Sequence, residues 1–198
     1  MKQNVKIGAV LLAAGKSERF GSNKLLASFG GRPLILRALE AANALSADKS
    51  LVVTGSTEIA ALAHAQGFEA IMNPDAHLGQ SHSIHLGLAA MQDMDAVLLM
   101  VCDQPQLTGA SLVRLTASFC ASPKGIASLK DETHLGNPAI FSKAYFPELL
   151  ALSGDRGAKG ILKAHPDDLL VVSCVSAHEL ADADTPQALE DMQRIACN

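Results

Sequence analysis

Residues 10–24 read Val-Leu-Leu-Ala-Ala-Gly-Lys-Ser-Glu-Arg-Phe-Gly-Ser-Asn-Lys, and the rest of the chain is organised around them. The apolar, partly β-branched run Val5–Leu12 predicts a buried strand. It ends at Ala13–Gly15, whose side chains are so small that backbone N–H groups can approach a ligand closely. Two cations, Arg19 and Lys24, follow in the same loop. A strand that opens into such a loop is typical of phosphate binding in α/β proteins.

The glycine spacing excludes the two commonest phosphate-binding motifs. The dinucleotide fingerprint requires G-x-G-x-x-G, and Gly15 has no glycine at those offsets. The P-loop requires G-x-x-x-x-G-K-[ST], whereas Gly21 is followed by serine and Lys24 comes three residues after it. The pattern that is left is L-x-A-G-x-S-x-R-x-G-x-x-K. Its alternative interpretation is an ordinary strand-to-helix turn with solvated cations.

Length and charge narrow the class of protein. A chain of 198 residues with 48% hydrophobic and 18% charged residues is long enough for one compact α/β domain, here expected over residues 1–198. The net charge of -4 gives no basic field for nucleic acid. An anionic substrate must therefore be held by local cations.

The cysteines and the apolar runs indicate the cellular compartment in which the protein is expected. The four cysteines are scattered and form no C-x-x-C pair, so neither a zinc framework nor a disulfide scaffold is expected. The N-terminus has no signal-peptide pattern, and no apolar run approaches the roughly 20 residues of a membrane span. We expect a cytoplasmic protein that does not bind a membrane.

Strand and helix patterns alternate along most of the chain. This alternation predicts a Rossmann-like three-layer α/β/α fold with a mainly parallel sheet, to which the Gly125–Phe141 segment adds an antiparallel strand. The expected strands are Val5–Leu12, Ser50–Thr54, Phe68–Met72, Asp95–Cys102, Gly125–Leu129, Pro138–Phe141 and Leu169–Val175. The expected helices are Pro33–Leu45, Glu58–Gln66, one opened by Leu78–Ile84 and ending near Met91, Ser111–Phe119, Arg156–His165 and Pro186–Ile195.

One acidic residue stands where such a sheet binds ligands. Asp103 follows an apolar strand directly, and Gln104-Pro105 stops any continuation. Ligands of open α/β sheets bind at the carboxyl ends of the strands. A carboxylate there suits Mg²⁺, which prefers carboxylate and phosphate oxygens with water. The alternative is that Asp103 only caps the next helix.

The loop pattern closely resembles the signature of nucleotidyltransferases of the molybdenum-cofactor type. Five further stretches extend the resemblance over most of the chain: Gly79–Ser83, Asp103–Pro105, Gly136–Phe141, Gly154–Lys159 and Asp182–Pro186. The resemblance implies a molybdenum cofactor cytidylyltransferase activity, in which CMP passes from CTP to the phosphate of molybdenum-bound molybdopterin and pyrophosphate leaves. Related guanylyl- or sugar- and polyol-phosphate nucleotidyltransferases are alternatives, as is a nucleotide-binding protein without turnover.

The resemblance also implies a set of site residues. Catalytic roles fall to Arg19, Lys24 and Asp103, and Mg²⁺ to Asp103 and Asp184, with Asp182 as the alternative second ligand. Acceptor binding falls to Asn137, Asp155 and Arg156, although the last two could instead form a surface ion pair. The nucleotide-binding residues are Leu12, Ala13, Ala14, Gly15, Lys24, Gly79, Gln80, Ser81 and Ser83. In the guanylyltransferases that the chain resembles, glycine usually stands where this chain has Ala14, so cytosine is the expected base. A molybdoenzyme or its maturation chaperone would be the protein partner.

Overall fold

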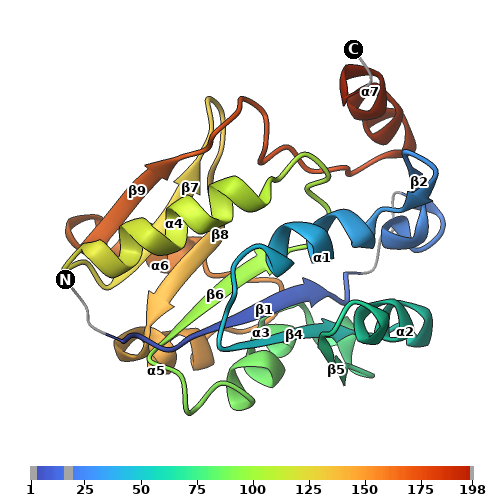
Figure 1. The fold of residues 1–198 in the computed structure, drawn as a ribbon. Helices are drawn as coiled ribbons and strands as arrows, with labels where there is room; N and C mark the ends of the chain where they lie inside the picture. The colour runs from blue at the N-terminus through green and yellow to red at the C-terminus, as the bar shows by residue number, and fades with distance from the viewer. Residues whose placement is uncertain (1–3, 16–19, 197–198) are drawn as a thin grey trace.

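The computed structural model describes residues 4–15 and 20–196, and they form a seven-stranded sheet in the order β5-β4-β1-β6-β8-β7-β9. Six strands run parallel, and β8 alone runs antiparallel to its neighbours β6 and β7 (Figure 1). The mainly parallel α/β prediction and its antiparallel strand are confirmed. The strands are β1 (Ile7–Ala13), β4 (Lys49–Thr54), β5 (Glu69–Met72), β6 (Ala96–Val101), β7 (Ile126–Lys130), β8 (Leu135–Ser142) and β9 (Leu169–Ser173).

Strand β1 is buried on both faces, so its side chains serve two separate cores. Ala9 and Leu11 point to one core, and Val10 and Leu12 point to the other, as the period of two along a strand requires. Helices α1, α2 and α4 cover the first face, and α3, α5 and α6 cover the second (Figure 1). Their bounds are α1 (Ile35–Asn43), α2 (Thr57–Ala65), α3 (Gln80–Ala89), α4 (Gly109–Ala121), α5 (Phe146–Leu150) and α6 (Lys159–Ala164).

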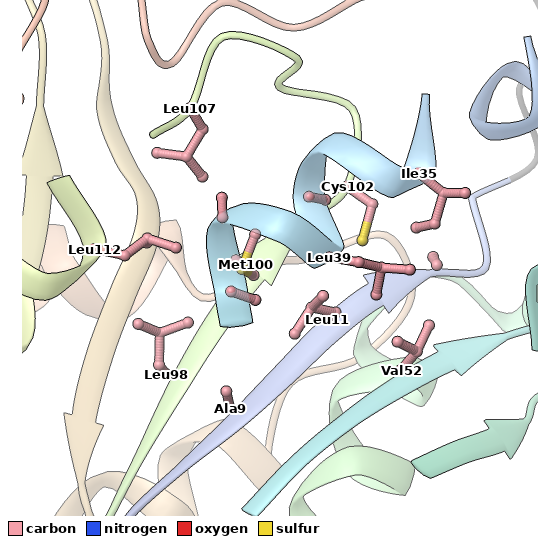
Figure 2. Close-up of a cluster of buried hydrophobic side chains, with 14 of the residues drawn as sticks. Ala9, Leu11, Ile35, Leu39, Val52, Leu98, Met100, Cys102, Leu107 and Leu112 are labelled. Carbon is pink, nitrogen blue, oxygen red and sulfur yellow. The ribbon is translucent and has the colours of Figure 1, made fainter. Parts of the chain in front are cut away.

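The first core is packed directly beneath the strand ends that matter for function. Figure 2 shows Leu39 of α1 lying over Leu11 of β1, with Met100 of β6 and Cys102, the residue that follows β6, beside them. These four side chains are almost completely removed from water. Burial of this kind stabilises each side chain by about 1.5–3 kcal/mol, which fixes β1 and β6 side by side.

One glycine explains the close approach of α3 to the sheet. A Cβ atom at Gly87 would lie 2.4 Å from Cγ1 of Val10, so only glycine lets α3 sit at this depth on β1. The first residues of α3 are thereby held near the carboxyl end of β1, where the functional residues gather.

Three details differ from the expectation. Pro33 does not begin a helix: it lies in β3 (Arg32–Pro33), which pairs with β2 (Ser28–Phe29) in a small hairpin. The reason is the turn at Gly30 and Gly31, whose φ angles of 62° and 78° close the hairpin before α1 can start at Ile35. Helix α5 was not expected, and α6 begins at Lys159 rather than at residue 156.

The C-terminal helix α7 (Pro186–Ala196) lies near the β2 hairpin, at the upper right of Figure 1. Its start is capped by Thr185, whose Oγ1 accepts a hydrogen bond from the N–H of Ala188 at 3.1 Å. Among the described residues, none of the helices has the length and hydrophobicity needed to cross a bilayer.

Candidate active site

A cavity of about 700 Å³ lies at the carboxyl ends of β1 and β6. The position agrees with the general rule for open α/β sheets. Five segments that are distant in sequence supply its walls. Its lining residues are Leu12, Ala14, Gly15, Lys24, Leu25, Ala76, Gly79, Gln80, Ser83, Val101, Cys102, Asp103, Asp155 and Asp184.

Lys24 is the central cation of this cavity. Its ammonium Nζ lies 2.6 Å from Oδ2 of Asp103 and 3.2 Å from Oδ1 of Asp184. The turn that carries it is fixed by Asn23, whose side chain accepts a hydrogen bond from the N–H of Leu25. Burial alone would lower the pKa of Lys24, but the charge and hydrogen bonds of Asp103, with those of Asp184, raise it above 10.5. The lysine is therefore a permanent positive charge.

Backbone contacts bring the second acidic segment to the end of β6. The N–H of Ala183 donates a hydrogen bond to the carbonyl oxygen of Asp103 at 2.8 Å. Nε2 of Gln104 donates to Oδ1 of Asp182 at 3.1 Å. The Gln104 amide thus holds Asp182 outside the cavity. Asp184, in contrast, faces Lys24 and lines the cavity. Burial raises the pKa of Asp182, and the neighbouring charge of Asp103 raises it further.

The two carboxylates that face the cavity fit a hard divalent cation. Oδ1 of Asp103 is buried and has no hydrogen-bond partner among the described residues, although its Oδ2 is bound to Lys24. Such an oxygen suits a metal ligand, because a buried acceptor left unpaired is otherwise unfavourable. Within residues 4–15 and 20–196, no cluster of three or more histidine, cysteine, aspartate or glutamate side chains could hold a metal alone. Phosphate and water oxygens would have to complete the coordination.

Six of the residues predicted to bind the nucleotide, apart from Lys24, line this cavity: Leu12, Ala14, Gly15, Gly79, Gln80 and Ser83. Ala13 and Ser81 do not. Ala13 is buried in the core shared with α1, because the alternation along β1 turns its side chain away from Leu12. Ser81 is also buried, and its N–H donates to the carbonyl oxygen of Gly154 at 3.1 Å.

That hydrogen bond belongs to a tight contact between two loops. A Cβ atom at Gly79, whose φ is +96°, would lie 2.3 Å from the carbonyl carbon of Gly154. A Cβ atom at Gly157 would lie 2.3 Å from Oε1 of Gln80. The Gly154–Gly157 turn therefore forms one unit with the start of α3, and it is a wall of the nucleotide cavity.

The three residues predicted to bind the acceptor are separated by this wall. Asp155 lines the main cavity. Arg156 lines a second, open cavity of about 550 Å³ together with Lys159 and Lys163. Oδ1 of Asn137 accepts a hydrogen bond from the N–H of Val101 at 3.3 Å, next to the end of β6. Arg19, the remaining predicted catalytic residue, lies outside the described residues.

The sequence interpretation missed a buried asparagine that organises the start of α3. Nδ2 of Asn73 donates to Oγ of Ser83 at 2.9 Å, and its Oδ1 accepts from the N–H of Asp75 at 3.0 Å. The ring Nδ1 of His82 also lies 3.0 Å from Oδ1. The Asn-Pro pair indicated only the end of a strand. Full burial of the amide became visible with the structure.

Cys102 adjoins this site but has no reactive character. Its thiol is almost fully buried, and burial raises its pKa, with the charge of Asp103 adding to the effect. A protonated thiol is a poor nucleophile. The side chain packs beneath α1 instead (Figure 2).

Comparison with known proteins agrees with this geometry. The family described as "MobA-like NTP transferase domain" matches residues 9–169. Purine catabolism protein PucB of Bacillus subtilis (strain 168) is 33% identical over 93% of this chain and 95% of its own. Nicotine blue oxidoreductase of Paenarthrobacter nicotinovorans is 28% identical over 96% of both chains. The crystal structure of Rv0371C in complex with manganese, from Mycobacterium tuberculosis H37Rv, is 25% identical, with a TM-score of 0.73 and coverage of 96% of this chain and 98% of that one.

The matched range begins in β1 and reaches into β9, so it takes in the small-residue loop, Lys24, Asp103 and the Gly154–Gly157 turn. With its mostly parallel sheet and its nucleotide-sized cavity at the strand ends, the chain belongs to the MobA-like NTP transferases, a family of nucleotidyltransferases.

Proposed function

We propose that this chain transfers CMP from CTP to the phosphate of a molybdopterin-type acceptor and releases pyrophosphate. The observation that carries the proposal is Lys24 placed between Asp103 and Asp184 in the cavity below the small-residue loop. A cation with two acids at the carboxyl edge of a parallel sheet suits the binding of a metal-complexed triphosphate.

Five residues that line the cavity have proposed roles in this reaction. The backbone at Ala14 and Gly15 would cradle the nucleotide, and Lys24 would hold its phosphates. Asp103 and Asp184 would hold Mg²⁺, which when bound neutralises charge on the α-phosphate. The manganese complex of Rv0371C supports a divalent ion in this family. The acceptor phosphate is already ionised, so the chain need only position it, and no covalent nucleophile is required.

Cytosine is the proposed base because of the size of the slot beside it. Ala14 lines the cavity, and its methyl group narrows the space that a glycine would leave. A pyrimidine needs less room than a purine. One methyl group gives only about 1–3 kcal/mol of discrimination, so contacts from Gln80 and Ser83 must contribute to base selection.

The acceptor is proposed to lie across the Gly154–Gly157 turn. Arg156 and Lys159 in the second cavity offer positive charge to an anion, and Lys159 packs near Gly136. Asn137 next to β6 offers an amide to a ring edge. A molybdoenzyme or its maturation chaperone would then receive the product, and the scattered cysteines favour a cytoplasmic location for this exchange.

The test is an assay of pyrophosphate release with each of the four NTPs, Mg²⁺ and molybdenum-bound molybdopterin. CTP should give the highest kcat/KM, and a higher value with GTP would contradict the choice of base. Asp103→Asn and Asp184→Asn should each lower the rate and raise the Mg²⁺ requirement. Asp182→Asn is the matched control with the smaller effect, because this carboxylate accepts a hydrogen bond from Gln104 and lies outside the lining of the cavity. Normal activity in a folded Asp103→Asn protein would contradict the metal assignment.

A further inference from the structure

The position between Asp103 and Asp184 is held by a cation that belongs to the chain itself. Nζ of Lys24 lies 2.6 Å and 3.2 Å from their oxygens, and the lysine side chain is only 13% exposed. The carboxylates differ in exposure, at 20% for Asp103 and 55% for Asp184. The lysine therefore bridges an inner acid and an outer acid at the mouth of the cavity.

A divalent ion bound through Oδ1 of Asp103 and a carboxylate oxygen of Asp184 would lie within a few ångströms of this ammonium, because Oδ1 and Oδ2 belong to the same carboxylate. Its bonds to carboxylate oxygens are about 2.1 Å long for Mg²⁺, shorter than either ammonium contact. An ammonium group left at its present distance from Oδ2 of Asp103 would face a doubly charged ion at close range, which is strongly unfavourable at such separations. Metal binding to both carboxylates thus requires Lys24 to leave them.

Departure of Lys24 from the two acids is favoured when a further anion in the cavity receives its charge. In the absence of nucleotide, the ammonium would give up its contacts with Asp103 and Asp184 in a partly buried position without gaining a phosphate contact, which is unfavourable. A triphosphate in the same cavity supplies new charge-assisted contacts. The charges also balance: two carboxylates with one ammonium carry net charge -1, and the divalent ion then neutralises the acids while the ammonium neutralises phosphate.

We propose that Lys24 is a resident counter-ion that makes the binding of a divalent metal to Asp103 and Asp184 conditional on nucleoside triphosphate. The metal and the nucleotide then strengthen each other's binding by the same factor. Between turnovers the ammonium offsets part of the charge of the two acids and keeps them ordered. This inference rests on the proposed function only for the identity of the anion that draws Lys24 away.

The first test uses metal alone, so that it does not depend on any enzymatic activity. Binding of Mn²⁺ is measured by electron paramagnetic resonance for the wild-type protein, Lys24→Met, Lys24→Arg and Lys24→Met with Asp103→Asn. Lys24→Met should bind Mn²⁺ at least about tenfold more tightly than wild type, because the competing charge is gone while the length of the side chain is kept. Lys24→Arg should bind as weakly as wild type, and the double variant should lose the gain.

A matched control separates local displacement from general electrostatics. Lys49 makes a 3.6 Å ion pair with Glu69 at the β4–β5 edge of the sheet. Lys49→Met removes the same charge from the chain and should leave Mn²⁺ binding unchanged. Equal Mn²⁺ affinity in wild type and a folded Lys24→Met protein would overturn the proposal, as would an equal gain in Lys49→Met.

The deciding measurement of the second test is made on the wild-type protein, so it does not depend on how any variant folds. Equilibrium dialysis of labelled CTP, without acceptor, should show at least about tenfold tighter binding with Mn²⁺ than with a chelator. Lys24→Met should show a smaller metal effect. Metal-independent CTP binding in wild type would overturn the coupling. If Lys24→Met gains Mn²⁺ affinity while no NTP binds or reacts, the counter-ion role stands and the proposed function fails.

Discussion

Asp131 is expected to stabilise the fold and to hold the acidic segment of the site in place. Its buried carboxylate accepts three backbone hydrogen bonds, from Thr133 at 2.9 Å, His134 at 2.7 Å and Leu180 at 3.1 Å. The carbonyl oxygen of Leu180 accepts a further bond from Gln104 at 3.1 Å. The peptide groups on both sides of Leu180, two residues before Asp182, are therefore anchored.

The size of the effect follows from the pKa. Burial alone would raise the pKa of Asp131, but the N–H donors of Thr133, His134 and Leu180, with the charge of His134, lower it from 3.8 to about 2. At 1.36 kcal/mol per pKa unit, the ionised form stabilises the folded state by about 2.4 kcal/mol near neutral pH. Because the folded pKa is the lower one, this stabilisation is present above pH 3.8 and is lost as the pH falls towards 2. About half of it is gone at pH 3.

Asp131→Asn tests this reasoning. The asparagine amide would place an N–H donor against the N–H of Leu180, so we expect a loss of roughly 2–4 kcal/mol at pH 6. The difference from wild type should shrink by about 1 kcal/mol at pH 3, where the wild-type carboxylate is losing its charge advantage. Urea unfolding followed by circular dichroism at both pH values measures the two differences.

The exposed neighbour Glu132 provides the control, because Glu132→Gln removes the same charge without a buried partner. This control should change the free energy of unfolding by less than about 0.5 kcal/mol. An Asp131→Asn protein as stable as wild type, or a stability difference that is the same at pH 6 and pH 3, would refute the argument. The first result would contradict the stabilising role of the hydrogen bonds to Asp131, and the second would contradict its lowered pKa.

Two further predictions concern the walls of the cavities. Gly157→Ala should raise the KM for the nucleotide several-fold with little loss of stability, because the added Cβ would push aside only the end of the Gln80 side chain. Gly160→Ala is the control: nothing lies within 4 Å of a Cβ at this position, so the KM should be unchanged in the same assay. Arg156→Ala should raise the KM for the molybdopterin acceptor while the KM for CTP barely changes. A rise in the KM for CTP alone would contradict the placement of the acceptor site at Arg156. Arg32→Ala is the matched control, because it removes an exposed cation that is paired with Glu40.

Much of the fold could be predicted because strand and helix patterns report local burial. A continuous apolar run predicted strand β1. The proximity of Lys24 to Asp103 followed from the rule that parallel strands place their carboxyl ends at one edge of the sheet, where ligands bind. The hairpin at Pro33 was not predicted, because a proline fits the first turn of a helix and a short edge strand equally well. Two glycines with positive φ decided between them.

Contacts between backbones are the part of the site that no sequence pattern carries. The close approach of Gly79 to Gly154 is possible because neither residue has a side chain. A glycine in the sequence, however, does not show whether it serves a flexible turn or a tight backbone contact. The same holds for the anchoring of Leu180, in which two distant polar side chains, Asp131 and Gln104, bind one apolar residue's backbone. Sequence motifs identify residues that contact a ligand, because the types of their side chains indicate the chemistry. The residues that hold those side chains in place act through peptide groups, and they become visible only when the chain is folded.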